Sequence, residues 1–289
     1  MNTRRGLAAL AGLALLLASA STEAQPKRRP QEAPDRAPRL DVEAIFDRQR
    51  DLIDAEFAKL APSRLGVPEI YFVGFASFAG QDVFRREVTS VRDLMDERFA
   101  TKDRSLLLLN HRDTTAELPL ASATNLARSL TRLGRIMNVD KDALVLFITT
   151  HGLPNRLAVE FPRLGLNDMS PGMLKAALDR SGIRNRILVI SACYSGSFIE
   201  TLKTPHTLIM TAARADRPSF GCSNERSWTF FGDALFNRAL RETRSFTDAF
   251  DRAKATVTGW ERERKFDPSE PQMFAGDQIR PLLDALAAR

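Results

Sequence analysis

Short apolar runs alternate with amphipathic helical patterns along most of the chain. Five runs have the length of buried strands, and they cover residues 70–75, 106–109, 144–148, 187–190 and 208–210. After the first run, apolar residues recur at spacings of three and four, as at Phe84, Val88 and Val91, which is typical of a helix with one buried face. Strand-length runs separated by helices indicate a parallel sheet with crossover helices. The pattern therefore predicts an α/β fold.

Other stretches predict further helices and one hairpin. Ser170 is placed to cap a helix that has Pro171 in its first turn, and Ser245 with Asp248 resembles a capping box. A helix between the second and third strands is marked by Leu126, Leu130, Leu133 and Met137. The hairpin is expected near residues 157–161, and the other helices over residues 40–60, 228–240 and 245–263. The first of these is amphipathic and is expected to pack on the outside of the domain.

The first 24 residues have the three parts of a secretory signal peptide. A basic start at Arg4 and Arg5 precedes an apolar run over residues 7–18, and small residues follow. The run is short for a bilayer span, which needs about 20 residues. Cleavage near Ala20 or Ala24 is therefore predicted, with an uncleaved membrane anchor as the alternative. The protein is expected in the periplasm or outside the cell, with no stable membrane anchor after cleavage.

Residues 25–39 are rich in Pro and Arg and contain almost no large apolar side chain. Such a segment cannot bury enough surface to offset the entropy of ordering, so a flexible linker is predicted there, followed by one domain over residues 40–289. Residues 1–39 hold seven Lys and Arg against three acidic residues, and the rest of the chain holds 35 against 33. A nearly neutral domain without a basic stripe argues against a nucleic acid partner.

Two of the predicted strands lead directly to side chains of catalytic type. The third strand runs into His151 and the fourth into Cys193. In open α/β sheets the ligand site lies beyond the carboxyl ends of the parallel strands, so both side chains are expected at the same edge. Cysteine proteolysis needs a thiolate nucleophile and a base that later protonates the leaving amine. The pair is therefore the candidate catalytic dyad.

Small residues follow both members of this pair. Residues 194–197 read Tyr-Ser-Gly-Ser and predict a strand-to-helix elbow. The backbone N–H groups of such an elbow are expected to face the thiolate and a developing oxyanion. Gly152 directly follows the histidine and has no side chain to obstruct a substrate or its own N–H group.

Each residue of the pair also has a structural reading when it is taken singly. A cysteine at a buried strand end is often a small core residue, and a histidine there is often a hydrogen-bonded structural residue. Their pairing at neighbouring strand ends favours catalysis. The three histidines, His111, His151 and His206, lack the short spacings of a zinc site. Ser195 and Ser197 lack the Gly-x-Ser-x-Gly frame of serine hydrolases, so no metal and no cofactor is expected.

Three segments resemble those of a known family. The His-Gly at 151–152, the Ala-Cys-x-Ser-Gly-Ser at 192–197 and the Thr-Ala-Ala at 211–213 are similar to segments of the legumain-like cysteine peptidases, in particular of their bacterial members. The resemblance runs from about Ile70 to beyond Gly232. It implies a caspase-like fold, in which a mostly parallel central sheet and helices on both of its faces form a three-layer sandwich.

The same resemblance implies a catalytic arrangement. Cys193 and His151 would form the dyad, and the backbone N–H groups of Gly152 and Cys193 would be the oxyanion donors. The partner would be a peptide or protein substrate, cleaved after a residue held in a polar pocket. Amide transfer also occurs in the family and is an open variant.

Three positions depart from the legumains of animals and plants. Those proteins have Asp before the catalytic His, where this chain has Thr150, and Glu two residues before the catalytic Cys, where it has Ser191. Their Asn after the first strand, which orients the histidine, corresponds here to Ala76. Asparagine specificity is therefore not carried over.

Residues of the substrate pocket are predicted from their position along the chain. An inward-pointing Asp82 or Glu225 would favour a basic substrate residue, whereas an ordinary surface charge would not. Cys222 is expected to be a small buried residue of the loop over 216–227, with an inhibitory disulfide to Cys193 as the alternative. The candidates are Gln81, Asp82, Ser191, Asp216, Ser219 and Glu225.

The preferred function is an exported cysteine endopeptidase that hydrolyses peptide bonds. Two alternatives stay open. One is a non-catalytic scaffold or peptide-binding protein with the same fold, which the loss of the orienting Asn suggests. The other is an amide-transferring enzyme of the transpeptidase type.

Overall fold

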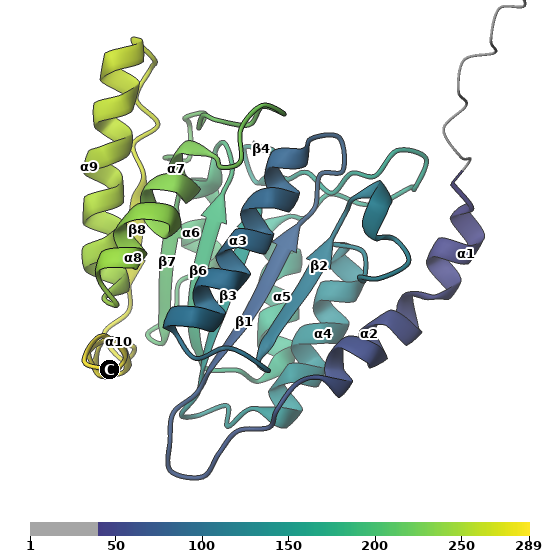
Figure 1. The fold of residues 1–289 in the computed structure, drawn as a ribbon. Helices are drawn as coiled ribbons and strands as arrows, with labels where there is room; N and C mark the ends of the chain where they lie inside the picture. Colours follow the sequence, from purple (N-terminus) through teal and green to yellow (C-terminus); the bar gives the residue numbers. More distant parts are fainter. Residues whose placement is uncertain (1–39) are drawn as a thin grey trace, which may run out of the picture. The chain divides into compact units, whose positions relative to one another are not determined.

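A six-stranded sheet lies at the centre of the structure, a computed structural model that describes residues 40–289 (Figure 1). The strand order is β2-β1-β3-β6-β7-β8; β8 runs antiparallel to β7, and all other neighbours are parallel. Two short strands form a separate hairpin, β4 (Gly152–Leu153) with β5 (Arg156–Leu157). The strands of the main sheet are β1 (Ile70–Ala76), β2 (Ser105–Leu109), β3 (Ala143–Thr149), β6 (Asn185–Ser191), β7 (Thr207–Thr211) and β8 (Gln272–Ala275).

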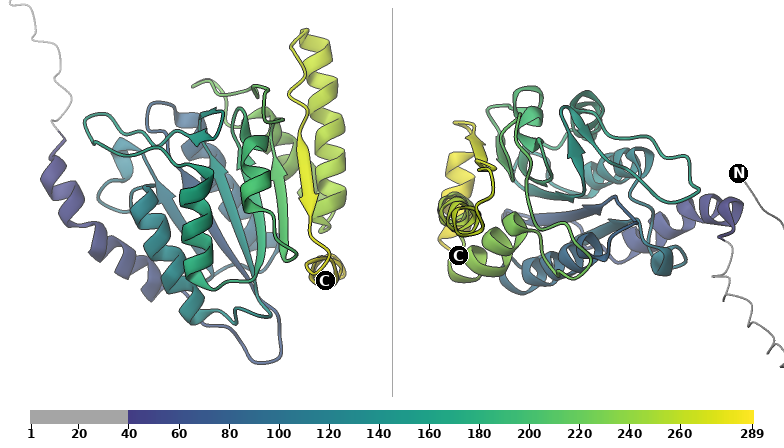
Figure 2. Two further views of the ribbon diagram at one scale, coloured as in Figure 1. Left: turned by 180° about the vertical axis from the view of Figure 1, so that it is seen from behind. Right: turned by 90° about the horizontal axis from the view of Figure 1, so that it is seen from above.

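Helices cover both faces of this sheet, as the view from above in Figure 2 shows. One face packs against α3 (Asp82–Arg98) and the helical segments after residue 229, and the other against α2, α4 and α5. The remaining helices are α1 (Val42–Asp47), α2 (Gln49–Ala58), α4 (Ala123–Ile136), α5 (Pro171–Ser181), α6 (Ile199–Leu202), α7 (Phe230–Gly232), α8 (Leu240–Glu242), α9 (Phe246–Arg264) and α10 (Arg280–Ala287). A π-helical segment (Asp233–Ala239) joins α7 to α8, and Arg112–Thr114 and Ser195–Phe198 are 3₁₀ turns.

Residues along the strands alternate between two hydrophobic cores. On β3, Val145 and Phe147 join the core beneath α3, whereas Leu144, Leu146 and Ile148 join the core beneath α4 and α5. Every residue of β1, β3 and β6 is buried. Because a strand covered on both faces needs apolar side chains on both, the runs in the sequence are continuous. The predicted three-layer α/β architecture is confirmed.

Side-chain caps begin two of the predicted helices. The Ser170 Oγ accepts a hydrogen bond of 3.2 Å from the Met173 N–H, with Pro171 in the first turn of α5. The Ser245 Oγ accepts one of 3.2 Å from the Asp248 N–H at the start of α9. Both N-cap predictions are confirmed.

Three regions differ from the pattern-based predictions. The hairpin lies earlier than residues 157–161, because its turn is made at Pro154 and Asn155, and Asn155 adopts a φ of 58°. The leading stretch over residues 40–60 divides at Arg48 into α1 and α2. β8 and α10 were not predicted, since β8 has only four half-buried residues and no clear periodicity.

The predicted signal peptide over residues 1–24 and the linker over residues 25–39 lie outside the described residues. Within residues 40–289, no helix is both long and apolar enough to cross a bilayer.

Truncating the centre of the sheet is expected to destabilise the fold. Leu146 is 0% exposed on β3, so Leu146→Ala should lower the free energy of unfolding by about 2–5 kcal/mol through lost burial and the cavity left behind. Urea denaturation followed by circular dichroism measures the change. Leu65 is 99% exposed, and the matched Leu65→Ala variant should unfold like the wild type. Equal stability of both variants would contradict the assignment of this core.

Candidate active site

β3 and β6 deliver the candidate dyad to one edge of the sheet. Thr149 and Ser191 are direct partners in the parallel ladder, and they lie two residues before His151 and Cys193. The ladder continues past them, because the Thr150 N–H donates to the Ser191 carbonyl at 3.2 Å. His151 and Cys193 therefore leave the sheet at the same level from adjacent strands.

Gly152 brings the two turns into contact. A Cβ atom built on Gly152 would lie 2.1 Å from the Cys193 carbonyl oxygen and 3.2 Å from the Ala192 Cβ. The first distance is too short for any side chain, so only glycine allows the backbone after the histidine to approach the backbone of the cysteine this closely. The expected role of Gly152 was an unobstructed approach for the substrate; the structure adds the contact between the two turns.

The Gly152 N–H group is left out of the β4–β5 ladder. The Ala158 N–H donates to the His151 carbonyl at 2.9 Å, and the next pair in the register is Gly152 with Leu157. In an antiparallel pair, hydrogen-bonded and non-hydrogen-bonded positions alternate. The Gly152 N–H is therefore free of strand pairing, as an oxyanion donor needs to be. Its role, like that of the Cys193 N–H, stays a prediction.

Gln81 orients the imidazole of His151. The Gln81 side chain, at the N-cap of α3, holds its Oε1 2.6 Å from the His151 Nε2 and donates from its own Nε2 to the Cys222 carbonyl at 2.9 Å. Since the amide nitrogen is used as a donor to Cys222, its oxygen must accept from the His151 Nε2–H. These hydrogen bonds assign the neutral tautomer that carries its proton on Nε2 and leaves Nδ1 with a lone pair. An orienting amide is thus present, five residues after the Ala76 position where the family resemblance suggested that it was missing.

Two aromatic rings enclose the same imidazole. Phe78 and Phe84 contact it edge-on, with ring centroids 4.5 and 5.1 Å from that of His151. Burial lowers the pKa of His151 below its ordinary value, and the negative charge of Glu160 opposes this effect. The imidazole is therefore kept neutral near pH 7, the state in which it can accept a proton.

The thiol of Cys193 lies against the backbone of Ser219. The Ser219 N–H donates to the Cys193 Sγ at 3.2 Å, the Ser219 carbonyl oxygen is 3.4 Å from the sulfur, and the Ser219 Oγ is 3.7 Å from it. Cys193 is half-buried. Of the six pocket candidates, Ser219 is the one that touches the Cys193 sulfur.

The elbow after Cys193 differs in part from its prediction. Tyr194 adopts a φ of 56°, in the left-handed region, and a 3₁₀ turn and α6 follow. The Tyr194 N–H donates to the Arg217 carbonyl at 2.8 Å, and the Gly196 N–H to the Ala213 carbonyl at 2.9 Å. These two groups were expected to face the thiolate. They do not, because the segment after β7 folds over the elbow and accepts their hydrogen bonds.

The other pocket candidates are scattered around the site. The buried Ser191 hydroxyl bonds to the Thr229 hydroxyl at 2.9 Å. Asp216 is exposed and forms an ion pair with Arg214, whose Nε lies 2.6 Å from the carboxylate. Glu225 is exposed. The structure therefore joins Gln81 and Ser219 to the dyad but not these three side chains.

Asp82 is hydrogen-bonded to His111 and paired with two arginines, outside the dyad. Its carboxylate lies 2.9 Å from the His111 Nε2, 3.5 Å from Arg85 and 3.7 Å from Arg86. A carboxylate with these partners is compensated already, which removes the main reason to expect a basic substrate residue at this position.

Cys222 packs against the core beneath α3, and its thiol and that of Cys193 are both free. Burial, with smaller contributions from Cys193 and Glu87, raises the pKa of Cys222 to about 12. A thiol that stays protonated at neutral pH is a poor nucleophile. Cys222 is half-buried, less so than expected, and forms no disulfide with Cys193 in this structure.

Several residues at this edge were missed by sequence reasoning. Phe78 and Phe84 enclose the imidazole, and Glu87, Thr149 and Thr229 form hydrogen bonds beneath the dyad. Glu87 had a detectable signal, because it is a charged residue three positions after Phe84 on the apolar face of α3. No pattern in the sequence indicated the roles of Thr149 and Thr229.

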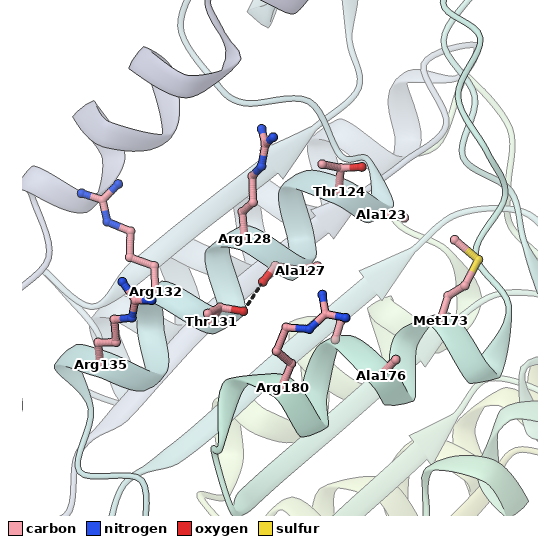
Figure 3. A pocket seen from close by; sticks show the side chains of 11 residues that line it. Ala123, Thr124, Ala127, Arg128, Thr131, Arg132, Arg135, Met173, Ala176 and Arg180 are labelled. Carbon is pink, nitrogen blue, oxygen red and sulfur yellow. Dashed lines mark hydrogen bonds between the residues drawn. The ribbon is translucent and has the colours of Figure 1, made fainter.

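A separate hollow lies between α4 and α5, and residues of these two helices line it (Figure 3). Its rim carries guanidinium groups of both helices, and its lining includes no cysteine, histidine or carboxylate. It is therefore not the site of the chemistry. The arginines are Arg128, Arg132, Arg135 and Arg180. Across residues 40–289, no group of three or more His, Cys, Asp and Glu side chains is placed to hold a metal ion.

Comparison with known proteins identifies the family. The sequence profile of the Peptidase C13 family matches residues 129–280, which is more than half of the chain and includes His151 and Cys193. The chain therefore belongs to the Peptidase C13 family, the legumain family of cysteine-type peptidases. No curated protein matches the sequence.

The fold also resembles that of a solved caspase. The crystal structure of caspase-1 from Spodoptera frugiperda matches with a TM-score of 0.50 and 13% identity, over 75% of this chain and 93% of that chain. At this identity the likeness concerns the fold alone. It confirms the caspase-like architecture that the family resemblance implied.

Placing a charge on the side chain of residue 81 should change the pKa of His151. In Gln81→Glu a carboxylate would face the His151 Nε2, so the pKa of His151 should rise from its depressed value. NMR titration of the imidazole protons measures it, with His151→Ala used to assign the resonances. Gln278 is exposed, and Gln278→Glu should leave the titration unchanged. A pKa of His151 that is the same in Gln81→Glu and wild type would contradict the contact.

Proposed function

We propose that this member of the family is an endopeptidase in which Cys193 is the nucleophile and His151 the general base. The observation that carries the proposal is the contact between the two turns, where Gly152 approaches the Cys193 backbone so closely that no side chain fits. Adjacent parallel strands of matched register supply the two residues. This arrangement supports proton transfer between a thiol and an imidazole better than a structural role for either residue.

The proposed reaction begins with the lone pair on the His151 Nδ1. This nitrogen takes the thiol proton, and the thiolate attacks the carbonyl carbon of the scissile peptide bond. The N–H groups of Gly152 and Cys193 are the proposed donors to the oxyanion that forms. The imidazolium then protonates the leaving amine as the C–N bond breaks. Water, deprotonated by the same imidazole, hydrolyses the thioester and restores the thiol.

Gln81 weakens the non-catalytic alternative. The scaffold alternative rests on Ala76, which stands where the family has its orienting Asn. The Gln81 amide holds the imidazole by its Nε2 and leaves Nδ1 as the base, so the support for catalysis is complete without that Asn. Hydrolysis is preferred over amide transfer because it needs only water as the second nucleophile.

Export is the second part of the proposal. The basic start, short apolar run and small residues over 1–24 support cleavage by a signal peptidase near Ala20 or Ala24. The proposed location of the enzyme is the periplasm or the medium.

A thiol-directed peptidyl acyloxymethyl ketone should label the purified protein at Cys193. Labelling should be absent in Cys193→Ala, and His151→Ala should lower its rate at least about 100-fold through loss of the base. Cys222→Ala is the matched control and should label like the wild type, because the raised pKa keeps that thiol protonated at neutral pH. Mass spectrometry of the modified peptide measures the site. Label that persists in Cys193→Ala would contradict the proposal.

A peptide library incubated with the protein distinguishes hydrolysis from amide transfer. Hydrolysis should give new carboxyl termini even when a primary amine is added in excess. Amide products at the expense of hydrolysis would favour the transfer alternative, and cleavage restricted to chain ends would contradict an endopeptidase.

Expression of the full chain in a Gram-negative host tests export. The protein recovered from the periplasm or medium should begin directly after Ala20 or Ala24, as N-terminal sequencing would show. A matched variant with Leu13→Arg and Leu15→Arg interrupts the apolar run and should stay in the cytoplasm with its leader intact, because charges in that run oppose insertion. Recovery of the uncleaved wild-type chain in the membrane fraction would instead support the anchor.

A further inference from the structure

Glu87 is a buried carboxyl group that the proposed reaction does not use. It lies on α3 with 0% of its surface exposed. It takes part in none of the ion pairs formed within residues 40–289. Its hydrogen bonds come instead from two threonines: the Thr149 hydroxyl donates to Oε2, and Thr229 donates to Oε1 from its N–H at 3.0 Å and from its hydroxyl at 2.7 Å.

The directions of these hydrogen bonds follow from the number of protons. The Thr229 hydroxyl has one proton, which it gives to Glu87, so it accepts from the Ser191 hydroxyl at 2.9 Å and from the Gly232 N–H at 3.0 Å. Every donor in the network thus leads to the carboxylate. A protonated Glu87 would have to donate to one of the groups that now donate to it, and one hydrogen bond would be lost.

The network joins three segments of the active site. Thr149 is two residues before His151, and Ser191 is two residues before Cys193. Thr229 ends the loop that carries Ser219, which contacts the thiol. A Cβ on Gly232 would lie 1.8 Å from the Glu87 Oε1, so the first turn after Thr229 also packs directly against the carboxyl group.

We propose that Glu87 is a positioning residue of the peptidase, whose carboxylate holds the ends of β3 and β6 and the base of the Ser219 loop in the arrangement that the dyad needs. The inference rests on the proposed function of Cys193 and His151. Glu87 itself touches neither side chain of the dyad and acts through Thr149, Ser191 and Thr229.

The ionisation of Glu87 makes this role sensitive to pH. Burial raises its pKa to about 7; the hydrogen bonds from Thr149 and Thr229 oppose the rise, and the charge of Asp233 adds to it. Ionisable groups on the elements packed here include His151, whose pKa is lowered, and Cys222, whose pKa is raised. Asp233 is itself paired with Arg238 at 3.5 Å. The carboxylate network is therefore complete above about pH 7 and loses a hydrogen bond below it.

Glu87→Gln removes the titration while keeping the size of the side chain. Its kcat/KM should be about tenfold below wild type at about pH 8, because a small displacement of a dyad is costly. At about pH 5.5 the ratio of variant to wild type should approach one, since wild-type Glu87 is then protonated. Both proteins contain His151, so the ratio of their kcat/KM values removes the effect of its titration. Glu97 is exposed on the same helix, and Glu97→Gln should match wild type at both pH values. A ratio for Glu87→Gln that does not change with pH would overturn the proposal.

Thr149 supplies a second test if Glu87→Gln folds poorly. Thr149→Val keeps the shape of the side chain and removes the hydroxyl donor, so the midpoint of the pH profile should shift upward. Thr149→Ser keeps the donor and should restore the wild-type midpoint. Identical midpoints in Thr149→Val and wild type would overturn the proposal, and circular dichroism shows whether each variant is folded.

Alkylation separates this inference from the proposed function. In a Cys222→Ala background, iodoacetamide reacts with Cys193 alone, and its rate reports the placement of thiol and imidazole without any peptide substrate. The rate should fall about tenfold in Glu87→Gln at about pH 8 and match the background at about pH 5.5. A wild-type chain that cleaves no peptide defeats the proposed function. Equal alkylation rates with and without Glu87 at both pH values defeat the inference.

Discussion

The parallel register between β3 and β6 is the constraint on which this edge of the molecule depends. Thr149 pairs with Ser191, so the residues two steps further on, His151 and Cys193, start from the same level. Gly152 then lets the two turns touch. Gln81 and Ser219, from other segments, are oriented relative to the pair that the register creates. A shift of one residue in the register would move every side chain of the strand to the opposite face of the sheet. Because each face packs into its own hydrophobic core, such a shift would disrupt both cores.

The polar groups around the dyad are neutral where a charge would oppose proton transfer. The imidazole has an amide as its partner and two aromatic rings beside it. A carboxylate in place of the amide would favour the imidazolium before any substrate arrived. Among the acidic groups nearby, Asp82 is paired with Arg85 and Arg86, and Glu87 is buried beneath the strands. The charge of the exposed Glu160 opposes, without overcoming, the lowering of the His151 pKa by burial. The environment therefore favours a neutral His151 imidazole.

The sequence predicted the elements that have long apolar runs and missed contacts made by single residues. The strands that became β1, β3 and β6 are buried on both faces, and continuous apolar runs are the direct consequence. β8 has four half-buried residues and is defined by its pairing with β7, which no local pattern reports. The role of Gln81 was also hidden, because this N-cap residue contacts a histidine that lies 70 residues further along the chain. His151 and Cys193 were recognisable because each lies three residues after the end of a predicted strand.

The segment that includes β8 gives this fold an order of assembly. The loop that carries Ser219 rests on late residues of the sequence: the Arg214 N–H donates to the Ser269 carbonyl at 2.9 Å, and Phe220 stacks on Phe266 with ring centroids 4.5 Å apart. β8 then pairs along β7, from which the loop departs. Gln81, by contrast, belongs to an early part of the domain. The edge that carries His151 and Cys193 therefore closes only when synthesis has passed residue 275, so a growing chain holds the Cys193 thiol without the contacts that surround it in the finished fold.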